Sequence, residues 1–226
     1  MTRTRKLTIF LMRHGHCEGG EMLRGKTDVP LSAEGEEQMW DAWRLISDDI
    51  DGARLSLLTS PLRRCCDFAD ALVDDMPEFF ERSLQVAPWL SELDFGDWDG
   101  VPFAELEALH SDKLIEFWQA PLDITPPGGE PVRDFHQRVV TGWKELQQQL
   151  LKSDKDNALL VTHGGVIRSL MSDVICPGEL PAAGLFNAFD LPYGSVVKIS
   201  LFASEVGGQW QCSGRLHWNF ASSFPL

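Results

Sequence analysis

The stretch LTIFLMRHGH, residues 7–16, joins an almost unbroken apolar run to an abrupt change into arginine, histidine and glycine. Such a run, ended by a charged residue, is typical of a strand that is buried on both faces of a parallel sheet. Ligands bind in the crevice beyond the carboxyl ends of parallel strands. The stretch therefore predicts a buried strand over Leu7–Met12 that delivers Arg13 and His14 to a ligand-binding edge.

The remainder of the chain alternates strand patterns with helical patterns. A weak strand pattern lies near Val86, and the clearest helix is expected from Pro131 to about Leu151, where apolar side chains form one stripe. This alternation predicts an α/β fold with a mostly parallel sheet and helices on both of its faces. Further strands are expected at Arg54–Thr59, Ala158–Thr162 and Ser195–Phe202, and further helices over Met39, Trp43 and Ile46 and, after the start signal Ser60-Pro61, over Leu62, Cys66, Ala69 and Val73.

The segment of residues 95–130 is longer than an ordinary connection between core elements. Phe103, Leu106, Leu114 and Phe117 recur at helical spacing within it, and prolines and glycines follow at residues 126–129. An insertion of this kind commonly covers an active site and selects the substrate. We therefore expect a single domain over residues 1–226, with a helical cap insertion at about residues 95–130.

The chain of 226 residues carries a formal net charge of −14, a field that repels nucleic acids and anionic membranes. A small phosphorylated metabolite is compatible with this charge, provided that several cationic groups converge in a small pocket. The five cysteines include the adjacent pair Cys65 and Cys66, a pattern that favours reduced thiols over a disulfide framework. Because the sequence shows no signal peptide and no membrane-spanning run, we expect a cytoplasmic protein. A homodimer stays open.

Four separated segments concentrate residues that suit phosphoryl chemistry. Arginine guanidinium groups bind phosphate oxygens as planar forks of donors and stay charged at any working pH. Of two imidazoles, one can act as a nucleophile while the other donates to the phosphoryl group, and a carboxyl group can move the proton. Three of the segments follow expected strands, so their side chains should meet at one edge of the sheet. The segments are Arg13-His14-Gly15, Ser60-Pro61-Leu62-Arg63-Arg64, Glu92-Leu93-Asp94-Phe95-Gly96-Asp97-Trp98 and Thr162-His163-Gly164.

In this order, the four segments resemble the histidine phosphatase superfamily, also called phosphoglycerate mutase-like, over nearly the whole chain. The resemblance implies a three-layer α/β/α fold and a reaction that uses no metal and no other cofactor. It also implies a set of residue roles, in which His14 is the nucleophile, Glu92 is the proton donor, and Arg13, Arg64 and His163 bind phosphate.

Two details of this set depend on the resemblance. Helical periodicity leaves Arg63 and Arg64 open as phosphate ligands, and the family pattern selects Arg64. Gly25 and Gly164 lie in matching segments and are expected to join the substrate-binding residues.

Three segments, Gly25–Gly35 (GKTDVPLSAEG), Phe95–Gly100 (FGDWDG) and Gly128-Gly129-Glu130, are similar to those of α-ribazole phosphatases. These enzymes remove phosphate from a nucleotide-loop precursor of cobalamin, so the resemblance implies α-ribazole 5′-phosphate as the substrate. The leaving alcohol is then expected to contact apolar side chains of the cap, such as Phe103, Phe117 and Trp118.

The loop after His14 departs from the family pattern. The family usually has glutamate at the position of His16, a hydroxyl residue at Cys17 and asparagine at Gly20, and the last two help to hold phosphate. A thiol is a poor donor and glycine has no side chain, so we expect backbone amides of the Gly19-Gly20 turn to take over. Cys17 and Gly20 thus remain among the expected substrate-binding residues.

Three alternatives stay open beside a phosphatase. The spacing of His14 and His16 fits two metal ligands, but no matching acidic or histidine motif follows. A phosphoglycerate mutase would return the phosphoryl group to a second substrate oxygen, and a non-catalytic protein would bind a phosphorylated ligand without turnover. The phytase-like branch is excluded, because His16-Cys17-Glu18 and His163-Gly164 do not match its motifs.

Overall fold

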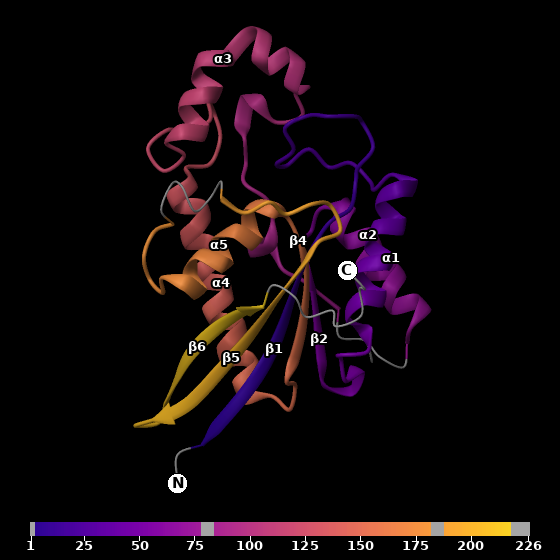
Figure 1. Ribbon diagram of the computed structural model, residues 1–226, viewed down its shortest axis with the longest axis vertical. Helices are drawn as coiled ribbons and strands as arrows, with labels where there is room; N and C mark the ends of the chain where they lie inside the picture. Colours follow the sequence, from indigo (N-terminus) through magenta and orange to yellow (C-terminus); the bar gives the residue numbers. More distant parts are fainter. Residues whose placement is uncertain (1–2, 78–83, 182–187, 218–226) are drawn as a thin grey trace, which may run out of the picture.

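The computed structural model describes residues 3–77, 84–181 and 188–217 of the chain. Its strands are β1 (Thr4–Arg13), β2 (Leu55–Thr59), β3 (Leu84–Val86), β4 (Asn157–Thr162), β5 (Val196–Val206) and β6 (Gln209–His217). They form one sheet in the order β3-β2-β4-β1-β5-β6 (Figure 1). The pairs β3–β2, β2–β4 and β4–β1 are parallel, whereas β5 is antiparallel to both β1 and β6. The expected mostly parallel sheet is confirmed.

Successive side chains of β1 are buried on opposite faces of this sheet. Leu7, Ile9 and Leu11 pack with α4 (Val132–Lys152) and α5 (Gly164–Ile175) on one face. Phe10 and Met12 pack with α1 (Ala33–Ser47) and α2 (Arg63–Asp75) on the other face. Because helices cover both faces, the strand needs nearly continuous apolar residues. Figure 1 shows the resulting three layers, which confirm the expected α/β/α fold.

The helix α3 (Phe103–Gln119) lies beyond the end of the sheet at which β1 finishes (Figure 1). Its backbone departs from helical geometry at His110, with φ −138° and ψ 21°, so the helix is kinked there. The buried ring of Phe117 anchors it, with centroids 6.2 Å from Phe95 and 5.9 Å from Trp98. The helix expected within residues 95–130 is therefore present, at the end of the sheet where the strands deliver the site residues.

The strand β6 was not expected from the sequence. It is an edge strand whose residues alternate between exposed and half-buried, so it lacks the apolar run that marks the inner strands. The start of α2 also differs, because the helix begins at Arg63 with Leu62 as its N-cap. The Ser60 hydroxyl, expected to cap this helix, accepts from the backbone N–H of Leu62 at 3.3 Å and also lies 2.7 Å from Nε2 of His163. Short helical turns occupy Gly52–Arg54 (η1), Pro88–Leu90 (η2) and Gly96–Trp98 (η3).

Candidate active site

A cleft of about 360 Å³ opens between α3 and the segments that follow β1 and β4. Its polar lining consists of Arg13, His14, Arg24, Glu92 and Arg168, together with Tyr193 and the backbone at residues 164–165. Its apolar lining includes Phe103, Phe117 and Trp118, the three cap residues expected to face the leaving alcohol. The cleft therefore joins a cationic floor to an aromatic wall.

His14 follows the last residue of β1 and is almost completely buried. Its Nδ1 lies 2.8 Å from the carbonyl oxygen of Gly15. Because a carbonyl oxygen only accepts, Nδ1 carries the proton of the neutral ring, and Nε2 presents an unshared electron pair. Burial, followed by the nearby Arg64 guanidinium, lowers the pKa of His14 well below its ordinary value. The ring is therefore a neutral nitrogen base at pH 7.

Arg64 and His163 are fully buried, and neither belongs to the cleft lining. The Nε of Arg64 donates to Nδ1 of His163 at 3.3 Å, so the neutral His163 ring carries its proton on Nε2. That Nε2 donates to the Ser60 hydroxyl at 2.7 Å. Burial, followed by Arg64 and His14, lowers the pKa of His163 well below its ordinary value. The ring centroids of His14 and His163 are 5.2 Å apart, so the two imidazoles are in contact.

The remaining donors of Arg64 fix a loop. Nη1 donates to the carbonyl oxygen of Thr27 at 2.9 Å and Nη2 to that of Gly25 at 2.8 Å. A side chain at Gly25 would lie 2.1 Å from the carbonyl oxygen of Leu93, so only glycine fits there. Gly25 thus contributes a carbonyl group that holds Arg64. Three of the five N–H donors of Arg64 are used in these bonds, which leaves two for a ligand.

Arg13 lies at the carboxyl end of β1 and lines the cleft. Its Nη1 donates to the carbonyl oxygen of Leu191, and its guanidinium carbon lies 4.3 Å from the centre of the Tyr193 ring. Its Nε is buried and has no hydrogen-bond partner among the described residues. An unpaired buried donor is costly, so an anion in the cleft would satisfy it.

Glu92 reaches the cleft from the segment that follows η2. Its Oε2 accepts from the backbone N–H of Gly165 at 3.0 Å, and its Oε1 accepts from that of Leu93 at 2.9 Å. Gly165 lies in the first turn of α5, where the helix dipole favours a carboxylate. A side chain at Gly165 would lie 2.2 Å from Glu92 Oε1, so this glycine is what lets the carboxylate approach the helix.

The structure separates the other expected substrate-binding residues. Gly164 lines the cleft, and a side chain there would lie 3.0 Å from Nη1 of Arg168. Cys17 is fully buried, and its Sγ lies 3.5 Å from Nδ1 of His14. This is the ring nitrogen that is bound to the Gly15 carbonyl oxygen. Gly20 is exposed and lies outside the cleft lining, where its carbonyl oxygen accepts from Arg24. The structure therefore brings Gly164 to the cleft but neither Cys17 nor Gly20.

Two arginines in the cleft, Arg24 and Arg168, were not expected from the sequence. Arg24 Nε is buried without a hydrogen-bond partner in the described part of the chain, and Arg168 donates from Nε and Nη2 to the carbonyl oxygen of Phe189. Within the described ranges, neither these two arginines nor Arg13 and Arg64 form an ion pair with a carboxylate. Arginines outside the site do form such pairs, namely Arg3, Arg5, Arg44, Arg54, Arg63, Arg133 and Arg138.

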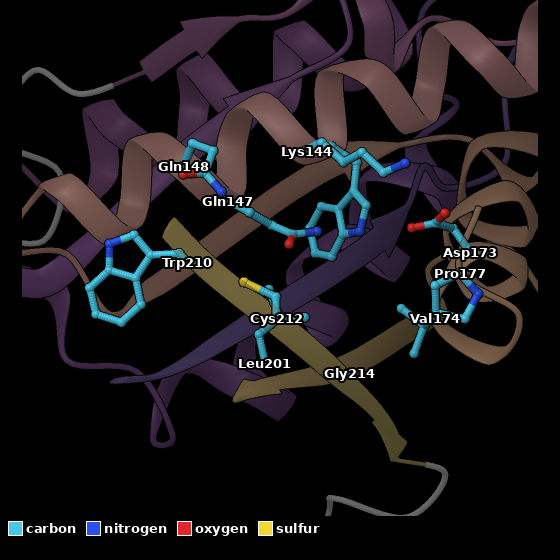
Figure 2. Close-up of a pocket in the computed structure, with 11 residues that line it drawn as sticks. Lys144, Gln147, Gln148, Asp173, Val174, Pro177, Leu201, Trp210, Cys212 and Gly214 are labelled. Atoms are coloured by element: carbon cyan, nitrogen blue, oxygen red, sulfur yellow. The ribbon is translucent and has the colours of Figure 1, made fainter. Parts of the chain in front are cut away.

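A second hollow, of about 280 Å³, lies between α4, α5 and the strands β5 and β6 (Figure 2). Figure 2 shows Trp210, Cys212 and Gly214 on its strand side and Lys144 and Asp173 on its helix side. None of the expected site residues lines it.

Within residues 3–77, 84–181 and 188–217, no group of three or more His, Cys, Asp or Glu side chains could hold a metal ion. No helix there is both long and apolar enough to cross a membrane.

Comparison with known proteins agrees with this geometry. A 2,3-bisphosphoglycerate-dependent phosphoglycerate mutase of Rhizobium etli is 29% identical over 74% of this chain and 79% of that protein. The solved mycobacterial glucosyl-3-phosphoglycerate phosphatase is 25% identical, with a TM-score of 0.72 over 96% of this chain and 100% of that chain. The α-ribazole phosphatase of Shigella flexneri, 24% identical over 85% of this chain and 90% of that chain, shares the fold with a TM-score of 0.70. Residues 9–207 match the histidine phosphatase superfamily (branch 1), and the chain belongs to this superfamily of enzymes.

Proposed function

We propose that the protein hydrolyses a phosphomonoester through a phosphohistidine formed on His14. The observation that carries the proposal is the state of this ring: its Nδ1 is bound to the Gly15 carbonyl oxygen, which leaves the Nε2 electron pair free at the cleft. Burial, followed by the charge of Arg64, lowers the pKa of His14 and keeps that pair unprotonated at pH 7.

Charge on the transferring group is stabilised from two sides. Arg13 offers the unpartnered Nε from the cleft wall, while Arg64 offers its two remaining donors from behind His14. We propose the Nε2–H of His163, now bound to Ser60, as a third donor, to a phosphoryl oxygen that would take the place of the hydroxyl. Such preorganised donors in a site with little water are the main source of stabilisation for a phosphoryl-transfer transition state.

The proposed reaction has two steps. The Nε2 pair of His14 forms a bond to phosphorus as the phosphorus–oxygen bond of the ester breaks, and the departing alkoxide takes a proton from Glu92. Water then attacks phosphorus and gives its proton to Glu92, while the N–P bond breaks and its electron pair returns to Nε2. Each carboxyl oxygen of Glu92 accepts one backbone N–H bond, which fixes the group and leaves a second lone pair on each oxygen to take up and return a proton.

The test is to trap the intermediate. Wild-type protein mixed with a ³²P-labelled phosphomonoester and quenched in alkali should carry acid-labile label on His14. His14→Ala should carry none and should lose at least about 10⁴-fold in kcat, as expected for removal of a nucleophile. Undiminished turnover by His14→Ala would refute the mechanism. Loss of activity in EDTA that Zn²⁺ restores would favour a metallophosphatase instead.

We further propose α-ribazole 5′-phosphate as the substrate. Support comes from the resemblance of residues 25–35 and 128–130 to α-ribazole phosphatases and from Phe103, Phe117 and Trp118, whose flat rings suit an aromatic base. Phosphate release from α-ribazole 5′-phosphate should exceed that from sugar phosphates and phosphoglycerates at equal concentration. Equal or negligible rates on the ribazole would remove this substrate and leave the reaction class intact.

Mutase activity is a second candidate, because relatives such as the Rhizobium etli protein are phosphoglycerate mutases. The chain has His16 where the family usually has glutamate, and this departure weighs against it. Incubation with 3-phosphoglycerate separates the two activities, since a mutase forms 2-phosphoglycerate while a phosphatase releases phosphate. Binding of many phosphorylated ligands with neither product would indicate a non-catalytic protein.

A further inference from the structure

The chain segment that carries Glu92 lacks regular structure of its own beyond the short turn η2. Buried backbone carbonyl groups that lie outside helices and sheets need hydrogen-bond donors from other parts of the chain. Thr162 supplies one of them, because its buried hydroxyl donates to the carbonyl oxygen of Leu90 at 2.8 Å. The carbonyl groups of Trp89, Ser91 and Glu92 receive theirs from a single side chain.

That side chain is Arg138, on α4. Its Nη1 donates to the carbonyl oxygens of Trp89 at 3.0 Å and Ser91 at 3.1 Å, and its Nη2 reaches that of Glu92 at 3.5 Å. Nε and Nη2 also donate to the two carboxylate oxygens of Glu130, at 3.0 and 2.9 Å. These bonds account for all five N–H donors of the guanidinium group, so none is left for a ligand.

Glu130 fixes the plane of that guanidinium group. Two parallel N–H···O bonds define orientation as well as distance, which a single point contact does not. The turn that bears Glu130 is itself docked on the Glu92 segment, because the backbone N–H of Glu130 donates to the carbonyl oxygen of Asp94 at 2.9 Å. A side chain at Gly129 would lie 2.5 Å from that same oxygen, so the Gly128-Gly129-Glu130 turn requires glycine there.

The carboxylate of Glu92 is thus held at both ends. Arg138 and Glu130 hold its backbone from one side, and the N–H of Gly165 binds Oε2 from the other, at 3.0 Å. Arg138 is not part of the cleft lining, and its hydrogen bonds approach the reacting atoms through the Glu92 segment, although its charge also contributes to the lowered pKa of His163. We infer that Arg138, oriented by Glu130, is a positioning residue that sets the distance between the Glu92 carboxyl group and the leaving oxygen.

The inference rests on the proposed function, in which Glu92 protonates the leaving alkoxide. An acid matters for a poor leaving group such as an alkoxide and matters little for p-nitrophenolate, which departs without a proton. Loss of positioning should therefore depend on the leaving group, whereas a general loss of structure should slow both substrates alike. The value of kcat/KM reports phosphoryl transfer to His14 and excludes the later hydrolysis of phosphohistidine.

The experiment compares kcat/KM for a sugar phosphate and for p-nitrophenyl phosphate in Arg138→Ala, Arg138→Lys, Glu130→Gln and Glu92→Gln. We expect Glu92→Gln and Arg138→Ala to lose about 10²-fold on the sugar phosphate and less than about fivefold on p-nitrophenyl phosphate. The double variant of Glu92→Gln with Arg138→Ala should be no slower on the sugar phosphate than Glu92→Gln alone, because both changes act through one carboxyl group. Arg138→Lys and Glu130→Gln should show smaller losses of the same kind, and they carry the test should Arg138→Ala fail to fold.

Arg133→Ala is the matched control. Arg133 lies on the same helix, pairs with Asp123 at 3.0 Å, and is exposed, so its removal should leave both rates unchanged. Equal losses on the two substrates in the Arg138 and Glu130 variants, with a leaving-group effect in Glu92→Gln, would overturn the inference alone. No leaving-group effect in Glu92→Gln would overturn the assignment of the acid, and the inference with it.

Discussion

The cleft beyond β1 and β4 and the hollow beside β6 have similar volumes, about 360 and 280 Å³, but the charged residues of the cleft are mostly cationic whereas those of the hollow balance. The hollow is lined by one cation, Lys144, and one anion, Asp173. The cleft is lined by three arginines and only one carboxylate, in a chain whose net charge is −14. A surplus of guanidinium groups, rather than concavity, is therefore what distinguishes an anion site on this molecule.

The origin of the difference lies in the backbone. The hollow is formed by side chains along the length of α4, α5 and β6, whose own backbone groups are paired within the helices and the sheet. The cleft is formed where strands end, so backbone N–H and carbonyl groups are free to bind side chains, as Gly165 binds Glu92 and Gly25 binds Arg64. The ends of the strands thus bring together backbone hydrogen-bonding groups, glycines that let side chains approach the backbone, and charged side chains.

Among the residues around His14, the largest effect is expected from Arg64→Ala. The change removes two donors from the proposed phosphoryl site and also releases His163 and the loop at Gly25, so kcat/KM should fall by about 10³-fold. Arg63→Ala is the matched control, because Arg63 is exposed and pairs with Asp67 at 3.1 Å. Steady-state assays of both variants would check this. Comparable losses of kcat/KM would mean that the buried Arg64 is no more important for activity than the exposed Arg63.

Gly165→Ala should have the next largest effect. The added methyl group would lie 2.2 Å from Glu92 Oε1, so the carboxylate must move away from the N-terminus of α5. We expect kcat on a sugar phosphate to fall by about 10²-fold with little change in KM, because the poor leaving group needs the acid. Gly214→Ala, at the hollow, crowds a Val174 methyl group at 2.9 Å and should leave both constants unchanged. A loss in kcat from Gly214→Ala would contradict the separation of the two regions.

The fold was predictable wherever burial requires a recognisable pattern of apolar residues in the sequence. The apolar runs of β1, β2, β4 and β5 and the stripe of α4 follow from burial, whereas β6 has only alternate half-buried residues and gives no such signal.

The surplus of positive charge at the cleft could not be predicted either. Arg24 and Arg168 resemble any surface arginine in sequence, and only the folded chain shows that carboxylate partners are missing beside them among the described residues.

The same limit applies to the residues behind the site. His14, His163, Arg64 and Glu92 were predicted because four short motifs occur together in order. Ser60 was expected only at the start of a helix, because the sequence does not show that its hydroxyl also contacts His163, which follows the neighbouring strand β4. The partnership of Arg138 with residues 89–92 was not predictable, because it joins positions 46 or more residues apart without an apolar pattern.

A smaller effect is expected from Arg24→Gln. Its buried Nε has no partner among described residues, so loss of the charged donor should weaken inhibition by inorganic phosphate by about 10-fold. Lys144→Gln, the equivalent change at the hollow, should leave the inhibition constant as it is. Inhibition constants for the two variants provide the measurement, and an equal change in both would show that long-range charge, rather than cleft geometry, attracts the anion.

The smallest effect concerns pH. Burial, followed by Arg64, lowers the pKa of both His14 and His163 in the folded chain, while in the unfolded chain both titrate near 6.5. Between these values the unfolded state binds more protons, so the free energy of unfolding should decrease as pH falls below about 6.5, by roughly 1 kcal/mol per histidine for the first unit or so. Urea unfolding at several pH values should show a shallower decrease in His14→Ala than in the wild type.

Because neutral His14 is the proposed nucleophile, kcat/KM should show no acid limb due to this residue until well below pH 6.5. An acid limb near pH 6.5 caused by protonation of His14 would mean that burial in the cleft does not lower the pKa of this ring.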